Sequence, residues 1–209
     1  MRKHMIESQL RTSDVNDLAV LAAFAKVARE AYVPTDSAGF SYMDRSIPLG
    51  EGRSLNPPVT IGQMLVEADI AKTDTVLLIG AASGYTAELV SHLAHHVTAI
   101  EESPRLAATA REKLAASANV TLVEGPLADG DPNGALHDII IIDGAVEEVP
   151  AAIARQLKPS GRIIAALNDR GVTRLARGVR VGDQLSFNPF ADMEAASLPG
   201  FAKPKAFSF

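Results

Sequence analysis

The sequence contains no cysteine, which excludes disulfide bonds, thiolate metal sites and a cysteine nucleophile. It also lacks a charged start followed by an apolar signal core, and any run near the ~20 consecutive apolar residues that a membrane-spanning helix needs. The net charge is −5 and the basic residues are scattered, which argues against a nucleic-acid partner held by phosphate contacts. From these absences we expect a soluble, cytoplasmic protein with neither a nucleic-acid partner nor a membrane partner.

The composition that remains is typical of a folded globular protein. A chain of 209 residues can bury a sizeable core. A hydrophobic fraction of 47% with 22% charged residues argues against disorder. The length fits one large domain or a domain with an appended arm.

The most informative segment is Val76-Leu-Leu-Ile-Gly-Ala-Ala-Ser-Gly-Tyr85, in which an apolar run turns into a glycine-containing loop and then a helix-like segment. Glycine lets the backbone adopt positive φ and approach a ligand closely, and the helix start offers free N–H groups. Glu101 follows Gly80 by 21 residues, near the ~20-residue offset at which an acid meets a ribose in dinucleotide-type sites. The pattern indicates an adenosyl cofactor, with a simple tight turn as the alternative.

Helix and strand patterns predict a doubly wound α/β sheet. The four isoleucines 139–142 do not alternate with polar residues, which suits a central parallel strand covered on both faces. The long connector 34–58 is either a functional lid or binding segment or, alternatively, a linker between domains. The expected helices are 13–31, 60–68, 85–95, 103–114 and 150–157. The expected strands are 75–79, 97–101, 120–123, 138–142 and 162–167, with 184–190 and 203–209 as a terminal antiparallel pair at the sheet edge.

Three N-terminal motifs carry a resemblance to a known family. They are Met5-Ile-Glu-Ser-Gln-Leu-Arg11, Val27-Ala-Arg-Glu-Ala-Tyr-Val-Pro34 and Tyr42-Met-Asp-Arg-Ser-Ile-Pro-Leu-Gly-Glu-Gly52. With Leu157-Lys-Pro-Ser-Gly-Arg162 farther along, the chain resembles the protein-L-isoaspartate O-methyltransferase family of class I methyltransferases. The resemblance covers nearly the whole chain.

The resemblance implies methyl transfer from S-adenosylmethionine to the α-carboxylate of isoaspartyl residues in damaged proteins. It also implies an N-terminal helical segment with a substrate-side connector over residues 1–58, and a cofactor-binding domain over 59–209 in one compact unit. The candidate catalytic residues are Asn56 and Ser54, and a lone Asp143 lacks the partners for a metal site. The candidate cofactor-binding residues are Gly80, Ala82, Ser83, Gly84, Tyr85, Glu101, Gly125 and Asp143.

The sequence departs from the family at functional positions. Where the family reads Gln-Thr-Ile-Ser after its Gly-x-Gly, this chain reads Arg53-Ser-Leu-Asn56, so an amide replaces the serine beside the reacting carboxyl. Leu78 replaces an acid before the loop, Ala82 replaces its middle glycine, and Pro126 replaces an aspartate near the adenine. Three hypotheses stay open: an active isoaspartyl methyltransferase, a methyltransferase with another acceptor, or a non-catalytic member that serves as a binding module.

Overall fold

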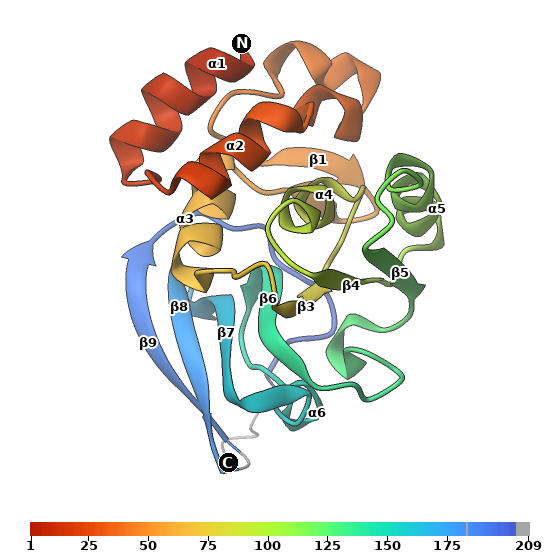
Figure 1. The fold of residues 1–209 in the computed structure, drawn as a ribbon, viewed down its shortest axis with the longest axis vertical. Coiled ribbons are helices and arrows are strands. Elements are labelled where there is room, and N and C mark those ends of the chain that lie inside the picture. The colour runs from red at the N-terminus through yellow and green to blue at the C-terminus, as the bar shows by residue number, and fades with distance from the viewer. Residues whose placement is uncertain (183, 204–209) are drawn as a thin grey trace, which may run out of the picture.

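The computed structural model describes residues 1–182 and 184–203, and within them a sheet of seven strands forms the centre of the molecule (Figure 1). The strand order is β5-β4-β3-β6-β7-β8-β9, with parallel pairing from β5 to β7 and antiparallel pairing from β7 to β9. The strands are β3 Thr75–Ile79, β4 His96–Glu101, β5 Val120–Glu124, β6 His137–Val146, β7 Leu157–Asp169, β8 Val172–Val181 and β9 Gln184–Asp192. The predicted mostly parallel sheet with a C-terminal antiparallel pair is confirmed.

Strand β6 lies in the middle of the sheet, as its isoleucine run predicts. Ile139 and Ile141 enter the hydrophobic core on one face, whereas Ile140 and Ile142 enter the core on the other. All four side chains are buried, because helices and turns cover both faces of the sheet.

The helices divide between these two faces. The first face carries α3 Pro58–Ala68, α4 Tyr85–Ser91 and α5 Pro104–Lys113, which share a core with the N-terminal residues. Ser103 caps α5, because its hydroxyl accepts a hydrogen bond from the Leu106 N–H at 3.2 Å. The second face carries the short α6 Ala151–Ala154 and the 3₁₀ turn Leu127–Asp129. Among the described helices, none is long and apolar enough to cross a membrane.

The predicted helix over 13–31 is wrong in extent. Asp14 adopts a left-handed conformation with φ 61°, and Asp17 then caps a shorter helix, α2 Leu18–Lys26, by accepting from the Val20 N–H at 2.8 Å. A helical segment precedes this break, in which α1 Arg2–Met5 continues through a π turn and a 3₁₀ turn to Ser13. A further 3₁₀ turn, Arg29–Tyr32, follows α2.

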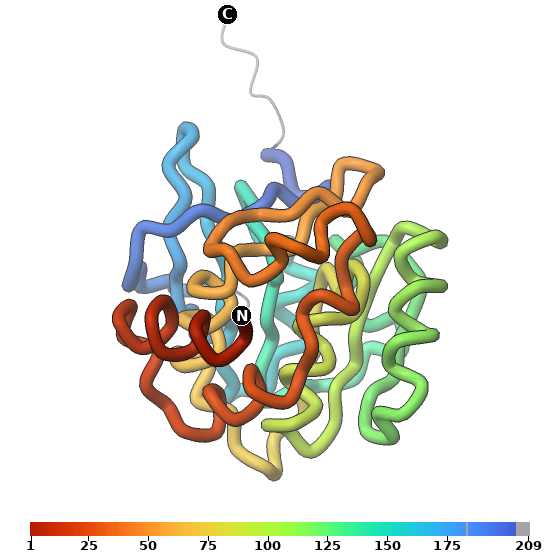
Figure 2. Tube along the Cα trace, turned by 90° about the horizontal axis from the view of Figure 1, so that it is seen from above, coloured from red at the N-terminus to blue at the C-terminus, as the bar shows by residue number. Residues whose placement is uncertain are grey.

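The connector 34–58 contains regular structure that the sequence pattern did not reveal. A 3₁₀ segment, Thr35–Phe40, leads to a two-stranded hairpin of β1 Ile47–Gly50 and β2 Arg53–Leu55. Seen from above, the red and orange N-terminal segments lie in front of the teal and cyan part of the trace, whereas the green coils lie to one side (Figure 2). The connector therefore covers the central sheet.

The C-terminal pair consists of other strands than predicted. Strand β9 matches the expected 184–190, but its partner is β8, whose residues were not predicted as a strand. Of the expected strand 203–209, residues 204–209 lie outside the described residues, and Lys203 is not in a strand. The motif 157–162 lies in β7, which begins before the expected 162–167, and its register with β6 is irregular there.

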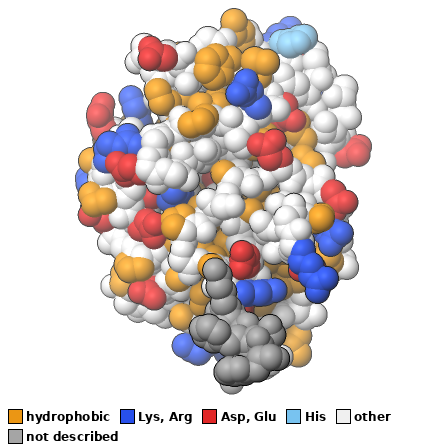
Figure 3. Space-filling model, turned by 180° about the vertical axis from the view of Figure 1, so that it is seen from behind, with side chains coloured by type: hydrophobic (Ala, Val, Ile, Leu, Met, Phe, Trp, Pro, Cys, Tyr) orange, Lys and Arg blue, Asp and Glu red, His pale blue; other side chains and the backbone are white. Residues whose placement is uncertain are grey.

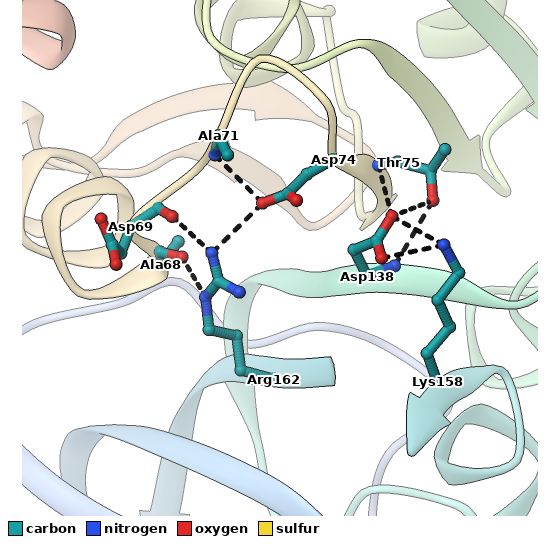
Figure 4. A network of polar contacts seen from close by, with 8 residues as sticks. All are labelled: Ala68, Asp69, Ala71, Asp74, Thr75, Asp138, Lys158 and Arg162. Atoms are coloured by element: carbon teal, nitrogen blue, oxygen red, sulfur yellow. Dashed lines mark hydrogen bonds and ion pairs between the residues drawn. The ribbon is translucent and has the colours of Figure 1, made fainter. Parts of the chain in front are cut away.

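Polar side chains join the strand starts at the amino edge of the sheet (Figure 4). The Asp138 carboxylate accepts from Lys158 Nζ at 2.8 Å and from the Thr75 N–H at 2.9 Å. Beside it, Arg162 forms an ion pair with Asp74 at 3.2 Å. Burial alone would raise the pKa of Asp138, but the bonds from Lys158 and Thr75 outweigh it and lower that pKa to about 2.

Candidate functional site

The loop after β3 has the backbone geometry that its glycines predict. Gly80 and Gly84 have φ of +90° and +97°, and Ala82 also takes a left-handed φ of +50°. The Gly80 and Ala81 N–H groups both donate to the Ile100 carbonyl, at 3.0 and 2.9 Å. At Gly84 a Cβ would lie 3.3 Å from Ala110, so glycine here also lets α5 pack against the start of α4. The loop is thus fixed beside the end of β4.

Ser83 and Tyr85 tie this loop to the N-terminal region. The Ser83 hydroxyl donates to the Tyr32 carbonyl at 2.6 Å. The Tyr85 ring is fully buried and meets the Tyr32 ring edge-on, with 5.5 Å between the centroids. The Arg29 guanidinium stacks 5.0 Å from the Tyr85 centroid, a cation–π contact that holds the two segments together. Arg29 is itself completely buried, and sequence reasoning assigned it no role although it lies inside one of the quoted motifs.

Glu101 ends β4 and has no exposed surface. Its Oε1 accepts from Arg53 Nη1 at 2.6 Å and from the Ser103 N–H at 3.0 Å, while its Oε2 accepts from the Ala82 N–H at 2.6 Å. The Arg53 side chain is only 3% exposed. The expected ribose ligand is therefore already engaged on both oxygens by groups of its own chain.

Asn56 occupies a similar internal position at the end of the hairpin. Its Nδ2 donates to Asp143 Oδ1 at 2.7 Å, and its Oδ1 accepts from the Ala196 N–H at 2.7 Å. Its main-chain carbonyl accepts from Arg29 Nη2, also at 2.7 Å. With 1% exposure, Asn56 connects the hairpin, β6 and the segment after β9.

Asp143 lies in β6 near the carboxyl edge and is 7% exposed. Burial raises the pKa of Asp143, because the charged form loses hydration. The Asn56 hydrogen bond and the nearby Arg53 charge oppose that rise. We call these four residues the edge cluster: Arg53, Asn56, Glu101 and Asp143. The edge cluster places two carboxylates, a cation and an amide within the closed carboxyl edge.

Two of the predicted site residues lie apart from the edge cluster. Ser54 is half-buried in β2 and lies between two buried neighbours, so its side chain faces the opposite side from Arg53. Gly125 follows β5, and its N–H donates to the Glu101 carbonyl at 3.0 Å. A Cβ at Gly125 would meet nothing within 4 Å, so this position has free space.

The segment after β9 fills the remaining space between the ends of β3 and β6. Ser197 bridges to Ala145, and the Leu198 N–H donates to the Ala145 carbonyl at 2.9 Å. Leu198 is so close that a Cβ at Gly144 would lie 2.5 Å from its Cγ, and one at Gly80 would lie 3.1 Å from its Cδ2. A Cβ at Gly80 would also lie 3.2 Å from Arg53 Nη2. The hairpin and this segment meet over the glycine loop.

As arranged, these residues do not fit an adenosyl cofactor. Glu101 is fully buried and accepts three hydrogen bonds from its own chain, so it presents no exposed oxygen to a diol, and Leu198 and Arg53 lie against the glycine loop. Two cavities lie near the loop: one of about 80 Å³ between Ala145, Ser197 and Leu198, and one of about 330 Å³ that Ser83 and Arg105 help to line. Neither is lined by Gly80 or Glu101. The loop backbone has the conformation predicted for a cofactor site, but Arg53 and Leu198 lie directly against it. In the described part of the chain, no group of three or more His, Asp or Glu side chains is placed to hold a metal ion.

Comparison with known proteins places this arrangement in a family. A sequence model of protein-L-isoaspartate(D-aspartate) O-methyltransferase matches residues 1–192. A protein-L-isoaspartate O-methyltransferase of Methylorubrum extorquens is 36% identical over 208 residues, covering 97% of this chain and 91% of the relative. Its counterpart in Methanoculleus marisnigri is also 36% identical, over 86% of this chain and 82% of the relative.

Solved structures agree on the fold. One protein-L-isoaspartate O-methyltransferase superposes with a TM-score of 0.81 at 22% identity, covering 96% of this chain and 66% of that one. A Plasmodium falciparum protein assigned to the same activity, solved with S-adenosyl-L-homocysteine, also gives 0.81 at 16% identity, covering 94% and 97%. The match over residues 1–192 and the identity of more than a third over most of two relatives show that the chain belongs to the protein-L-isoaspartate O-methyltransferase family, a family of S-adenosylmethionine-dependent enzymes.

Proposed function

We propose that this protein is an S-adenosylmethionine-dependent carboxyl O-methyltransferase that acts on isoaspartyl residues of damaged proteins. The observation that carries the proposal is the family match over residues 1–192, because it includes the N-terminal segment and connector as well as the sheet. Methyltransferase folds are shared by many activities, so a match confined to the sheet would not indicate the acceptor.

The chemistry suits a site without a dedicated base. An α-carboxylate is already ionised at neutral pH, so the acceptor needs positioning rather than deprotonation. In the proposal, Asn56 and Ser54 lie on the acceptor side, and the other site residues predicted from the sequence lie on the cofactor side. Cofactor can enter only in a conformation that differs from the described one, because Arg53 and Leu198 now take its space.

The proposed partner is a protein or peptide that contains isoaspartate, and the proposed setting is protein repair in the cytoplasm. On the face shown in Figure 3, cationic and anionic side chains lie intermixed. We propose no nucleic-acid or membrane partner. The boundary between residues 1–58 and 59–209 stays a prediction, although a single hydrophobic core includes Met5 and Val20 together with Val76 and Ile139.

A peptide pair tests this function. Methyl-labelled S-adenosylmethionine is incubated with the protein and with a peptide containing isoaspartate or its normal aspartyl counterpart. We expect a base-labile methyl ester on the isoaspartyl peptide alone. Ester formation on both peptides would indicate another acceptor, and its absence from both, in a protein that binds cofactor, would contradict the proposed function.

A second candidate function is a non-catalytic family member that uses the fold as a binding module. The filled carboxyl edge favours it, since both oxygens of Glu101 are bonded internally. This candidate predicts that neither the wild type nor any variant with an opened edge methylates an isoaspartyl peptide.

A further inference from the structure

Arg53 stands in an unusual place for an arginine. It belongs to the exposed tip region of a short hairpin, yet its side chain is 3% exposed and ends at Glu101. Burying a charge in such surroundings is strongly unfavourable unless a partner compensates it. Glu101 is that partner, and it is the residue from which the family resemblance expects a ribose contact. Arg53 thus supplies to Oε1 of Glu101 one of the donors that a bound diol would otherwise supply.

The outer part of the hairpin is held by contacts that solvent weakens. Glu51, at its turn, forms an ion pair with Arg105 at 2.7 Å, and these side chains are 46% and 52% exposed. Arg105 also donates to the Leu49 carbonyl at 2.6 Å. Exposed ion pairs of this kind contribute little to stability, so the buried pair of Arg53 and Glu101 is the stronger attachment of the hairpin to the site.

The segment around Leu198 is coupled to the hairpin through Asn56. The Asn56 amide contacts Asp143 on one side and the Ala196 N–H on the other. Leu198 then lies against Gly80 and Gly144, where it packs with Leu77 and Ile79 in the second core. The hairpin and the segment after β9 therefore both lie against the glycine loop, and the Asn56 side chain connects them.

We propose that Arg53, assisted by Leu198, is an internal plug of the cofactor site, which must leave Glu101 before an adenosyl cofactor binds. The proposal rests on the proposed function, because it assumes that the family's cofactor uses this edge. When only a fraction of molecules is open, the apparent dissociation constant rises by the inverse of that fraction. Weakening the plug therefore raises cofactor affinity without adding any contact to the cofactor.

Arg53→Gln is the sharpest variant, because the family motif that the sequence resembles has glutamine at this position. The glutamine amide can still donate to Glu101, and the Ala82 and Ser103 N–H groups continue to solvate the carboxylate. Loss of the guanidinium charge weakens the closed state, since charge-assisted bonds are about twice as strong as neutral ones. Leu198→Ala opens the other half of the site and gives a second, independent variant.

The experiment is calorimetric titration of the full-length wild type and variants with S-adenosyl-L-homocysteine, with circular dichroism to confirm folding. We expect Arg53→Gln to bind at least 10-fold more tightly than the wild type, and Leu198→Ala to bind more tightly as well. Arg105→Gln is the matched control, because it removes an arginine–glutamate pair from the same hairpin at the surface. It should bind like the wild type.

The outcomes separate the plug from the proposed function. If the wild type binds well and neither variant binds more tightly, the plug is overturned while the methyltransferase proposal stands. If Arg53→Gln binds tightly but esterifies no isoaspartyl peptide, the plug is supported and the proposed function fails. If neither Arg53→Gln nor Leu198→Ala binds at millimolar ligand, both are overturned.

Discussion

The two edges of the central sheet use the same chemistry in opposite surroundings. At the amino edge, Lys158 meets Asp138 at 2.8 Å, with side chains 37% and 27% exposed. At the carboxyl edge, Arg53 meets Glu101 at 2.6 Å, with side chains 3% and 0% exposed. The distances are alike, so burial decides what each pair does. The first pair joins strand starts in contact with water, whereas the second lies at the carboxyl ends of the strands, where open α/β sheets bind ligands.

Losing one partner lowers the free energy of unfolding more in a buried ion pair than in an exposed one. Removing one partner of a buried pair leaves an uncompensated charge, while an exposed charge is simply hydrated. Single substitutions at the carboxyl edge are therefore expected to lower stability strongly. The amino edge tolerates change because water replaces any lost partner.

The largest effect is expected for Glu101→Ala, which leaves Arg53 buried without an anion. We expect a loss of about 3–5 kcal/mol in the free energy of unfolding, and a melting temperature lowered by roughly 6–20 °C for a domain of this size. Urea denaturation followed by circular dichroism measures it. Glu102→Ala, which changes the half-exposed neighbour in the chain, should shift the midpoint little. Equal losses in the two variants would contradict the assigned burial of the pair.

An intermediate effect is expected for Asn56→Ser. Serine is too short to keep both side-chain contacts, so the Ala196 N–H or the Asp143 carboxylate loses a partner. Each buried group left unsatisfied costs about 1–3 kcal/mol, which thermal melting resolves. Asn119→Ser is the matched control near the amino edge, where the amide donates to the Ser91 carbonyl at 3.0 Å in a partly exposed position. A control variant that is destabilised as much as Asn56→Ser would show that the two edges do not differ.

The length and burial of each strand explain which strands can be predicted from the sequence. Strand β3 has the expected bounds, and β4 starts one residue early, because their buried apolar runs are local signals. The hairpin was not predicted because β1 and β2 are only 4 and 3 residues long and contain Pro48 and Gly50. Strand β8 lacks a two-residue alternation of apolar and polar side chains, because its arginines recur every third residue, at 174, 177 and 180.

The sequence predicts individual residues of the candidate site but not the contacts between them. Positive φ at Gly80 and Gly84, and Glu101 at the end of its strand, follow from local pattern. The pairing of Arg53 with Glu101 joins residues 48 positions apart, and that of Asn56 with Asp143 joins residues 87 apart. No periodicity encodes such contacts, because tertiary packing brings them together. The departures at Arg53 and Asn56 were visible in the sequence, yet their mutual connection appears only in the fold.

The smallest effect is expected at the amino edge, for Asp138→Asn. Its pKa is lowered from 3.8 to about 2, chiefly by hydrogen bonds from Lys158 and Thr75 that outweigh the opposing effect of burial. A carboxylate with a depressed folded-state pKa stabilises the fold above its unfolded pKa and loses that contribution as the pH falls through the folded value. We expect Asp138→Asn to lower the unfolding free energy at pH 7 by about 1 kcal/mol. The difference from the wild type should shrink between pH 4 and pH 2, over the interval that these two pKa values define.

Asp192→Asn, at an exposed pair with Arg174, serves as the control for a general charge effect. A gap between wild type and Asp138→Asn that stays constant down to pH 2 would show that the carboxylate at this edge contributes no charge-dependent stability.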